Sequence, residues 1–325
     1  MKINFVGSVT QGYVGEIADE VHLCDSLKTL GHEVTRVPRD IWKAYVDGVE
    51  PNVDWVLPQK ADINIICKWH HFNNGKYIKK LREISEAPVF YWTWDMMYDQ
   101  HNMDFIDWHK AMAQAADLLL TNEGGLIPGY EASLIKAQYF PFDVADDNLL
   151  KFDKDYVRDV AFFGSYLGQG DRVKYLKVIN EKEPVTIFSW NHEEWKKEGF
   201  EAYPVVYGEA FNKEVMRSKI CLQMSVNDHI WGYWSNRVGK TLLARGFLMA
   251  RYAPGMELFL KDGAAYFNTP EEAIEKIRYY LAMEDAREEI RFKGIKIGKS
   301  HFTSIQRCRE LVILAENYLK GAVQT

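Results

Sequence analysis

The sequence has few cysteines and no long hydrophobic run, and each absence excludes a class of protein. Its four cysteines lie far apart without a Cys-x-x-Cys pair, so neither a zinc ribbon nor a disulfide framework is expected. No apolar segment approaches the roughly 20 residues that a membrane-spanning helix needs. The segment Met1–Gly7 is too short and too interrupted for a signal peptide and resembles a first strand. We therefore expect a cytoplasmic protein with reduced thiols.

An excess of positive charge is also absent, because the formal net charge is −6. No global field therefore attracts the protein to nucleic acid or to an anionic membrane. A local groove lined by Lys76, Lys79, Lys80 and Arg82, with Trp69 nearby, remains an alternative surface for a nucleic-acid strand. The other interpretation of these cations is a solvated helix face.

The chain of 325 residues does contain two successive series of alternating strand-like and helix-like segments. Such alternation predicts mostly parallel sheets covered by helices on both faces. In the first series we expect strands at residues 3–7, 33–37, 62–68, 88–92 and 118–121, and helices at 16–30, 76–85 and 105–115. The pattern breaks at residues 139–155, which we interpret as a linker.

The second series begins with a buried strand at residues 159–165. Further strands are expected at residues 185–189, 205–207, 220–224, 247–250 and 265–267, with helices at 172–181, 212–218 and 237–244. Three helices, at 270–282, 285–299 and 304–318, end the chain. We predict an N-terminal domain at 1–150, a second domain at 151–302, and a final helix at 303–325 that returns to the first domain.

The segment Trp231–Met249 carries the most specific chemistry. A polar loop with a helix cap at Ser235 or Asn236 precedes a helix that has Arg237 and Lys240 in its first turn. Cations are unfavourable at a helix N-terminus unless an anion is bound there. The pattern predicts a diphosphate site, and the alternative is an exposed cap with incidental charges.

The residues that follow resemble a known family. The elements are Pro254–Phe259, Asp262-Gly263, Tyr279-Tyr280-Leu281 and His301-Phe302-Thr303 with Arg307. In this order and spacing, residues 231–311 resemble the C-terminal half of CgeB-like, group 1 family glycosyltransferases. More loosely, Asp159–Ser165 with Arg172 resembles the start of the family's second domain, and Ala116–Asn122 resembles a strand of its first domain.

This resemblance implies an α/β protein of the GT-B type, with two Rossmann-like domains facing across a cleft and C-terminal helices packing back. It implies a nucleotide-sugar donor, expected to be a UDP-sugar, held by the second domain without an obligatory metal or other cofactor. The donor-binding residues it indicates are Gly164, Ser165, Arg172, Ser189, Trp190, Ser235, Asn236, Arg237, Lys240 and Glu257. Glu257 has the alternative role of capping a turn. Because Ser235–Gly246 contains no carboxylate, the ribose contact and the stereochemical outcome remain open.

The first domain is expected to hold the acceptor. The loop after the first strand supplies Ser8, Thr10 and Gln11, and Trp69 follows the third strand. Three residues are alternative general bases: Asp95, which lies among aromatic residues past the fourth strand, and the pair His70 and His71.

The predicted activity is transfer of a hexose or pentose from a nucleotide-sugar to an unidentified acceptor. Carbohydrate, protein, small-molecule and modified nucleic-acid acceptors all remain open, although the net charge does not favour nucleic acid. One alternative is a metal-dependent GT-A transferase using Asp153-Lys154-Asp155. The other is a sugar- or nucleotide-binding GT-B protein without catalysis.

Overall fold

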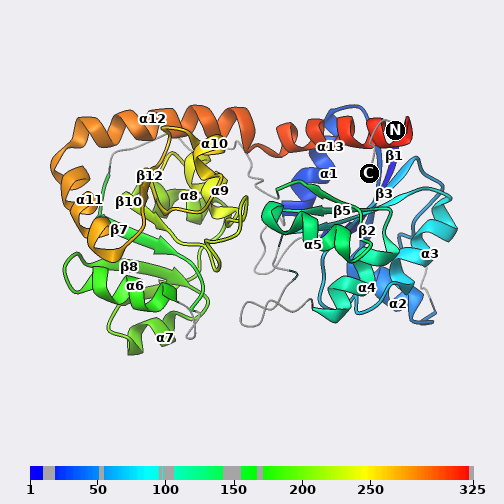
Figure 1. Ribbon diagram of the computed structural model, residues 1–325, viewed down its shortest axis with the longest axis horizontal. Helices are drawn as coiled ribbons and strands as arrows, with labels where there is room; N and C mark the ends of the chain where they lie inside the picture. The colour runs from blue at the N-terminus through cyan, green and yellow to red at the C-terminus, as the bar shows by residue number, and fades with distance from the viewer. Residues whose placement is uncertain are drawn as a thin grey trace. The chain divides into compact units, whose positions relative to one another are not determined.

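The computed structural model describes residues 1–9, 19–50, 55–94, 97, 106–141, 155–166 and 171–321. The chain divides into two structural units (Figure 1). The first combines Met1–Phe142 with Ser304–Thr325, and the second is Asp143–Thr303. Among the described residues, no helix combines the length and the apolar character needed to cross a membrane.

The first unit is built on a parallel sheet of six strands in the order β2-β1-β3-β4-β5-β6. The strands are β1 (Lys2–Gly7), β2 (Glu33–Pro38), β3 (Ile63–Cys67), β4 (Val89–Thr93), β5 (Leu118–Thr121) and β6 (Ala137–Tyr139). Since β3 to β5 are buried throughout, they are predominantly apolar on both faces rather than alternating, with Asn64 of β3 as a buried polar exception. The short strand β6 was not predicted from the sequence.

Helices cover both faces of this sheet. They are α1 (Asp19–Thr29), α2 (Arg39–Val46), α3 (Lys76–Ser85), α4 (Asp107–Ala115), η2 (Gly124–Leu126), α5 (Ile127–Ala132) and α13 (Ser304–Leu319). Successive residues of β4 point to opposite faces. Tyr91 hydrogen-bonds His109 of α4, whereas the ring of Phe90 lies 5.1 Å from that of Tyr318 in α13. Helix α13 lies beside α1 (Figure 1), where the Cys308 thiol donates to the Leu23 carbonyl.

The second unit contains another parallel six-stranded sheet, in the order β12-β11-β10-β7-β8-β9. Its strands are β7 (Arg158–Phe163), β8 (Val185–Ser189), β9 (Glu201–Pro204), β10 (Ser218–Gln223), β11 (Leu248–Arg251) and β12 (Ala265–Phe267). Two Rossmann-like units are therefore present, and the predicted fold class is confirmed.

Helices also cover both faces of the second sheet. They are α6 (Asp171–Asn180), α7 (His192–Lys197), α8 (Gly208–Met216), α9 (Arg237–Leu243), α10 (Met256–Leu260), α11 (Pro270–Ala282) and α12 (Glu284–His301). On one face, Phe162 of β7 packs in a cluster with Leu176 of α6 and Ile277 of α11. On the other, Phe163 packs with Phe211 of α8.

The last strand of this sheet differs from the sequence prediction. We expected a strand at 205–207, but β9 spans Glu201–Pro204 and pairs with β8 from Thr186 to Ser189. The apolar residue Val206 instead packs from a loop onto the cluster around Phe163. Pro204 is tolerated because β9 is an edge strand.

Helix α12 approaches the loop before β12 through two glycines. A Cβ atom on Gly294 would lie 2.5 Å from the Gly263 carbonyl oxygen and 2.8 Å from Cδ2 of Leu242. A Cβ atom on Gly263 would lie 2.8 Å from Cα of Gly294. The absence of both side chains thus allows α12 to pack directly on backbone.

Candidate functional site

The carboxyl ends of β7 and β10 meet at the point where the second sheet changes its winding direction, which is where open parallel sheets bind ligands. Arg172 of α6 lies here, 5% exposed. Its guanidinium donates to the carbonyl of Ser165 after β7 at 3.1 Å and to that of Met224 after β10 at 2.7 Å. One arginine therefore bridges both strand ends.

A second arginine, Arg237, lies within electrostatic range of Arg172. Burial, and then the positive charge of Arg237, lower the pKa of Arg172 to about 10. The sequence prediction that Arg172 and Arg237 act together is consistent with this mutual repulsion. Two cations held within range of each other make an anion the natural ligand.

Two buried polar atoms beside these cations have no hydrogen-bond partner among the described residues. They are Nε of Arg172 and Oγ of Ser225, which follows Met224. Buried polar groups are normally paired, so an unpaired couple at a sheet's ligand-binding edge indicates groups that a ligand satisfies. Sequence reasoning missed Ser225. Its only signal is a small polar residue just after a strand.

The predicted cap residues lie at the start of α9. Ser235 Oγ accepts from the N–H of Arg237 at 3.3 Å and from its guanidinium at 3.1 Å. Arg237 and Lys240 are both partly exposed and lie three residues apart, on one side of the helix. Asn236 is the helix cap, and its side chain makes no capping hydrogen bond.

Gly239 of α9 packs closely against Phe302. A Cβ atom there would lie 3.0 Å from Cβ of Phe302. The aromatic ring of Phe302 therefore occupies the space in which a side chain at position 239 would lie.

An exposed aromatic pair follows β8 and β9. Trp190 is 56% exposed, and its ring centre lies 5.5 Å from that of Tyr207. Ser189 is buried, and its Oγ accepts from the N–H of Asn191. Of the two predicted residues here, Trp190 therefore offers a surface to a ligand, whereas the Ser189 side chain holds a turn.

Glu257 lies in the first turn of α10. Its carboxylate accepts from the Tyr252 hydroxyl at 2.9 Å and from the N–H of Gly255 at 3.2 Å. This geometry is the turn-capping alternative considered from the sequence. Gly164, by contrast, ends β7 as predicted, with its N–H donating to the Phe188 carbonyl.

In the first unit, several predicted residues gather at the carboxyl ends of β1 and β3. Ser8 follows β1, and the aromatic triplet Trp69, His70 and His71 follows β3. The two histidine rings are exposed, with centres 3.9 Å apart. Partial desolvation, followed by His71 and nearby cations including Arg39, lowers the pKa of His70. This direction of shift favours the neutral form of the His70 imidazole.

The predicted base Asp95 and the acceptor residues Thr10 and Gln11 lie outside the described residues. The flanks of Asp95 are anchored to the end of β5. Asn122 donates to the Trp94 carbonyl at 3.0 Å, and the Met97 N–H donates to the Glu123 carboxylate at 3.0 Å.

Three of the four cations predicted to line a basic groove are paired with carboxylates. Lys76, Lys80 and Arg82 pair with Asp47, Glu83 and Asp117 respectively. Asp117 also accepts from the N–H of Val89, so Arg82 lies at the amino ends of β4 and β5. Lys76 begins α3 at the opposite edge, because a crossover helix runs back along its sheet. These pairings leave little positive charge for a strand of nucleic acid.

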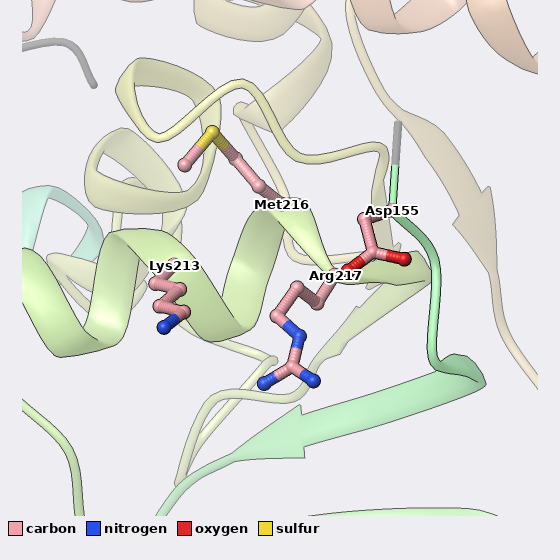
Figure 2. A pocket seen from close by; sticks show the side chains of 4 residues that line it. All are labelled: Asp155, Lys213, Met216 and Arg217. Atoms are coloured by element: carbon pink, nitrogen blue, oxygen red, sulfur yellow. The ribbon is translucent and has the colours of Figure 1, made fainter. Parts of the chain in front are cut away.

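A cavity of about 230 Å³ lies at the amino edge of the second sheet, away from this site (Figure 2). Asp155, Lys213, Met216 and Arg217 line it. Asp155 was the last residue of the Asp-x-Asp alternative, and it shares the cavity with two cationic side chains rather than with further carboxylates. Across the described ranges, no three His, Cys, Asp or Glu side chains are grouped to hold a metal ion.

Comparison with known proteins agrees with this geometry. Residues 169–313 match the family described as glycosyl transferase-like, a stretch that includes Arg172, Ser225 and all of α9. No curated protein sequence has a significant match to the chain.

Solved structures share the whole architecture at low identity. Sucrose-phosphate synthase from Thermosynechococcus elongatus has a TM-score of 0.69 and 8% identity, with 98% of this chain and 99% of that chain covered. An α-glucosyltransferase in complex with UDP and a 13-mer DNA containing a HMU base has a TM-score of 0.67 and 12% identity, with 97% of this chain and 99% of that chain covered. T4 phage BGT in complex with UDP-glucose has a TM-score of 0.64 and 13% identity, with both chains covered in full.

These likenesses show the GT-B fold. The family match adds that residues 169–313, nearly all of which lie in the second unit, are glycosyl transferase-like. The resemblance to group 1 glycosyltransferases is confirmed.

Proposed function

We propose that the protein transfers a sugar from a UDP-sugar to an acceptor hydroxyl without a metal ion. The observation that carries this proposal is the Arg172–Arg237 pair at the winding change of the second sheet, with the unpartnered Nε of Arg172 between the two strand ends. UDP or UDP-glucose in the solved relatives supports the choice of nucleotide.

In this proposal the diphosphate binds against the two guanidinium groups, with Lys240 on the same side of α9. The bond between the anomeric carbon and the diphosphate breaks, and the electron pair leaves with UDP. Preorganised cations stabilise the negative charge that develops on this leaving group. Ser225 Oγ is a further donor at the same position.

The first unit presents the acceptor in this proposal. Ser8, Thr10, Gln11 and Trp69 line the acceptor side. Asp95, His70 and His71 are the candidates that the sequence indicates for the group that removes the acceptor proton. The lowered pKa of His70 supports its candidacy, because only neutral imidazole accepts a proton.

The acceptor class stays open among carbohydrate, protein, small molecule and modified nucleic acid. Because one relative was solved with DNA containing a HMU base, such DNA is a direct test of the last class. Burial raises the pKa of all four thiols and keeps them unreactive, which supports a reducing, cytoplasmic location.

A thermal-shift series tests the donor assignment. UDP at about 100 times its dissociation constant should stabilise the protein by about 2.7 kcal/mol, with the same shift in EDTA. GDP, ADP, TDP and CMP serve as matched controls and should give smaller shifts. A shift that EDTA abolishes would sink the metal-free assignment, and no shift with any nucleotide would sink the donor site.

Trp190→Ala tests where the uracil ring of UDP binds. Loss of an aromatic stacking surface costs about 1–3 kcal/mol per base, so UDP affinity should fall by roughly 5- to 100-fold. Pyrophosphate affinity, measured by the same calorimetric titration, should not change. Tyr279→Ala, an exposed aromatic on α11 of the same unit, is the control. Equal UDP affinity in Trp190→Ala and wild type would show that the uracil ring does not stack on Trp190.

A further inference from the structure

A buried carboxyl group lies where the first sheet changes its winding direction. Strand β1 has β2 on one side and β3 on the other, so this point lies at the carboxyl ends of β1 and β3. Glu20, in the first turn of α1, is 5% exposed there. A Cβ atom on Gly7 would lie 3.5 Å from both Cγ of Glu20 and Cβ of Cys67, the last residue of β3.

Glu20 has weak structural ties compared with the other buried carboxylate at this edge. Its carboxylate accepts from its own N–H and, at a long 3.4 Å, from the N–H of Ser8, while Arg39 acts on it through charge alone. Glu123, by contrast, accepts hydrogen bonds from the Tyr130 hydroxyl and the Met97 N–H. A buried acid held only by backbone N–H groups is costly to keep for structure alone.

The charges that face Glu20 are few. Burial raises its pKa to about 7, hydrogen bonds from its own N–H and that of Ser8 and the charge of Arg39 lower it, and Asp19 raises it. The neighbouring thiols of Cys24 and Cys67 have raised pKa values and stay neutral. The group is therefore close to half-ionised at neutral pH, which suits a proton acceptor.

The surrounding side chains are those of a binding surface. Arg39, the first residue of α2 after β2, lies over the ring of Trp69 at 5.0 Å and acts electrostatically on both Glu20 and His70. A charged group, an aromatic face and a buried acid thus converge from the ends of β1, β2 and β3. Such convergence of few polar groups with an aromatic face is typical of ligand sites.

We propose that Glu20 is the group that takes the proton from the attacking hydroxyl. This inference rests on the proposed glycosyltransferase function. The acceptor oxygen bonds to the anomeric carbon, the bond from that carbon to the diphosphate breaks, and the electron pair leaves with UDP. The hydroxyl proton passes to the Glu20 carboxylate and then to solvent. In this arrangement Arg39 and Trp69 orient the acceptor, and Glu20 activates it.

The test uses the full-length protein with UDP-glucose and water as acceptor, so that no other acceptor has to be known. Glu20→Gln should slow release of UDP by about 10²- to 10⁴-fold and leave UDP affinity unchanged. A base works when deprotonated, so wild-type kcat/KM should fall as the pH drops through about 7. This fall in kcat/KM at acidic pH (the acidic limb) should be absent in Glu20→Gln. It should be kept, at a reduced rate, in Glu20→Asp. Asp19→Asn, one residue away, is the matched control. It should retain the rate above neutral pH and keep the fall in kcat/KM, moved to lower pH because the charge of Asp19 raises the pKa of Glu20.

A second measurement does not depend on turnover. Carboxyl ¹³C NMR of glutamate-labelled protein, with Glu20→Gln used to assign the signal, should show Glu20 titrating near pH 7. Titration near the ordinary value of about 4.3, or UDP release by Glu20→Gln at the wild-type rate, would overturn the proposal. Wild-type protein that fails to bind UDP would instead refute the proposed function, and the two failures are therefore distinguishable.

Discussion

We expect the Arg237→Ala variant to bind UDP about 10- to 100-fold more weakly than wild type while unfolding at the same temperature. A hydrogen bond to a charged group contributes about 1.5–3 kcal/mol, which corresponds to this range of affinity. Arg237 is partly exposed at the first position of α9, so its removal leaves no cavity in the core. Isothermal titration with UDP and with pyrophosphate measures the effect.

The two ligands separate the possible roles of Arg237. A diphosphate contact predicts equal losses for UDP and pyrophosphate, whereas Trp190→Ala should affect UDP alone. Arg278→Ala is the matched control, because Arg278 is an exposed arginine on α11 of the same unit, where it pairs with Glu183. Wild-type affinity for both ligands in a folded Arg237→Ala protein would remove the diphosphate assignment. We prefer Arg237 to Arg172 for this test because Arg172 also bridges the carbonyls of Ser165 and Met224.

The second large effect concerns stability. In an exposed helix, replacing glycine with alanine gains about 1 kcal/mol. Gly294→Ala should have the opposite sign, because its Cβ would lie 2.5 Å from the Gly263 carbonyl oxygen, and this backbone atom cannot rotate away. Overpacking typically costs about 1–3 kcal/mol. Urea unfolding should therefore show a lower midpoint with an unchanged m-value.

Lys296→Ala is the control for Gly294→Ala, since Lys296 is exposed on the same helix. Its free energy of unfolding should stay within about 0.5 kcal/mol of the wild-type value. A Gly294→Ala protein as stable as wild type would mean that α12 shifts away from the loop at no cost, contrary to the close packing described here.

The strands were largely predictable because buried parallel strands are continuous apolar runs between turn residues. Ile63–Cys67 and Val185–Ser189 approximate such runs, with one and two polar residues respectively, and both lie where expected. The run at 205–207 has the same composition, yet its valine fills the core from a loop, and tertiary packing overrides propensity there. Helix α7, with only six residues, was missed because so short a segment carries no helical period.

The site was predictable only where chemistry stands out along the chain. Arg172 follows a glycine turn after a strand, and Arg237 begins a helix at which cations are otherwise unfavourable. Ser225 and Glu20 carry no such signal. A serine after a strand is ordinary, and an acid in the first turn of a helix is what the dipole favours. What sets them apart is burial among segments distant in sequence, such as Ser8 and Arg39 around Glu20.

The return of α13 to the first unit determines the order in which the chain can mature on the ribosome. The segment Asp143–Thr303 is continuous, so every strand of its sheet has been translated before α13 exists. The first sheet is made earlier, but its last covering helix, α13, is translated only at the end. Until then the ring contact of Tyr318 with Phe90 and the hydrogen bond from Cys308 to Leu23 cannot form. The N-terminal strands therefore spend the rest of elongation with one apolar face covered by α1 but not by α13, and such incompletely covered apolar surface is prone to aggregation. A premature stop codon before Ser304 would leave the second unit whole and the first permanently unfinished.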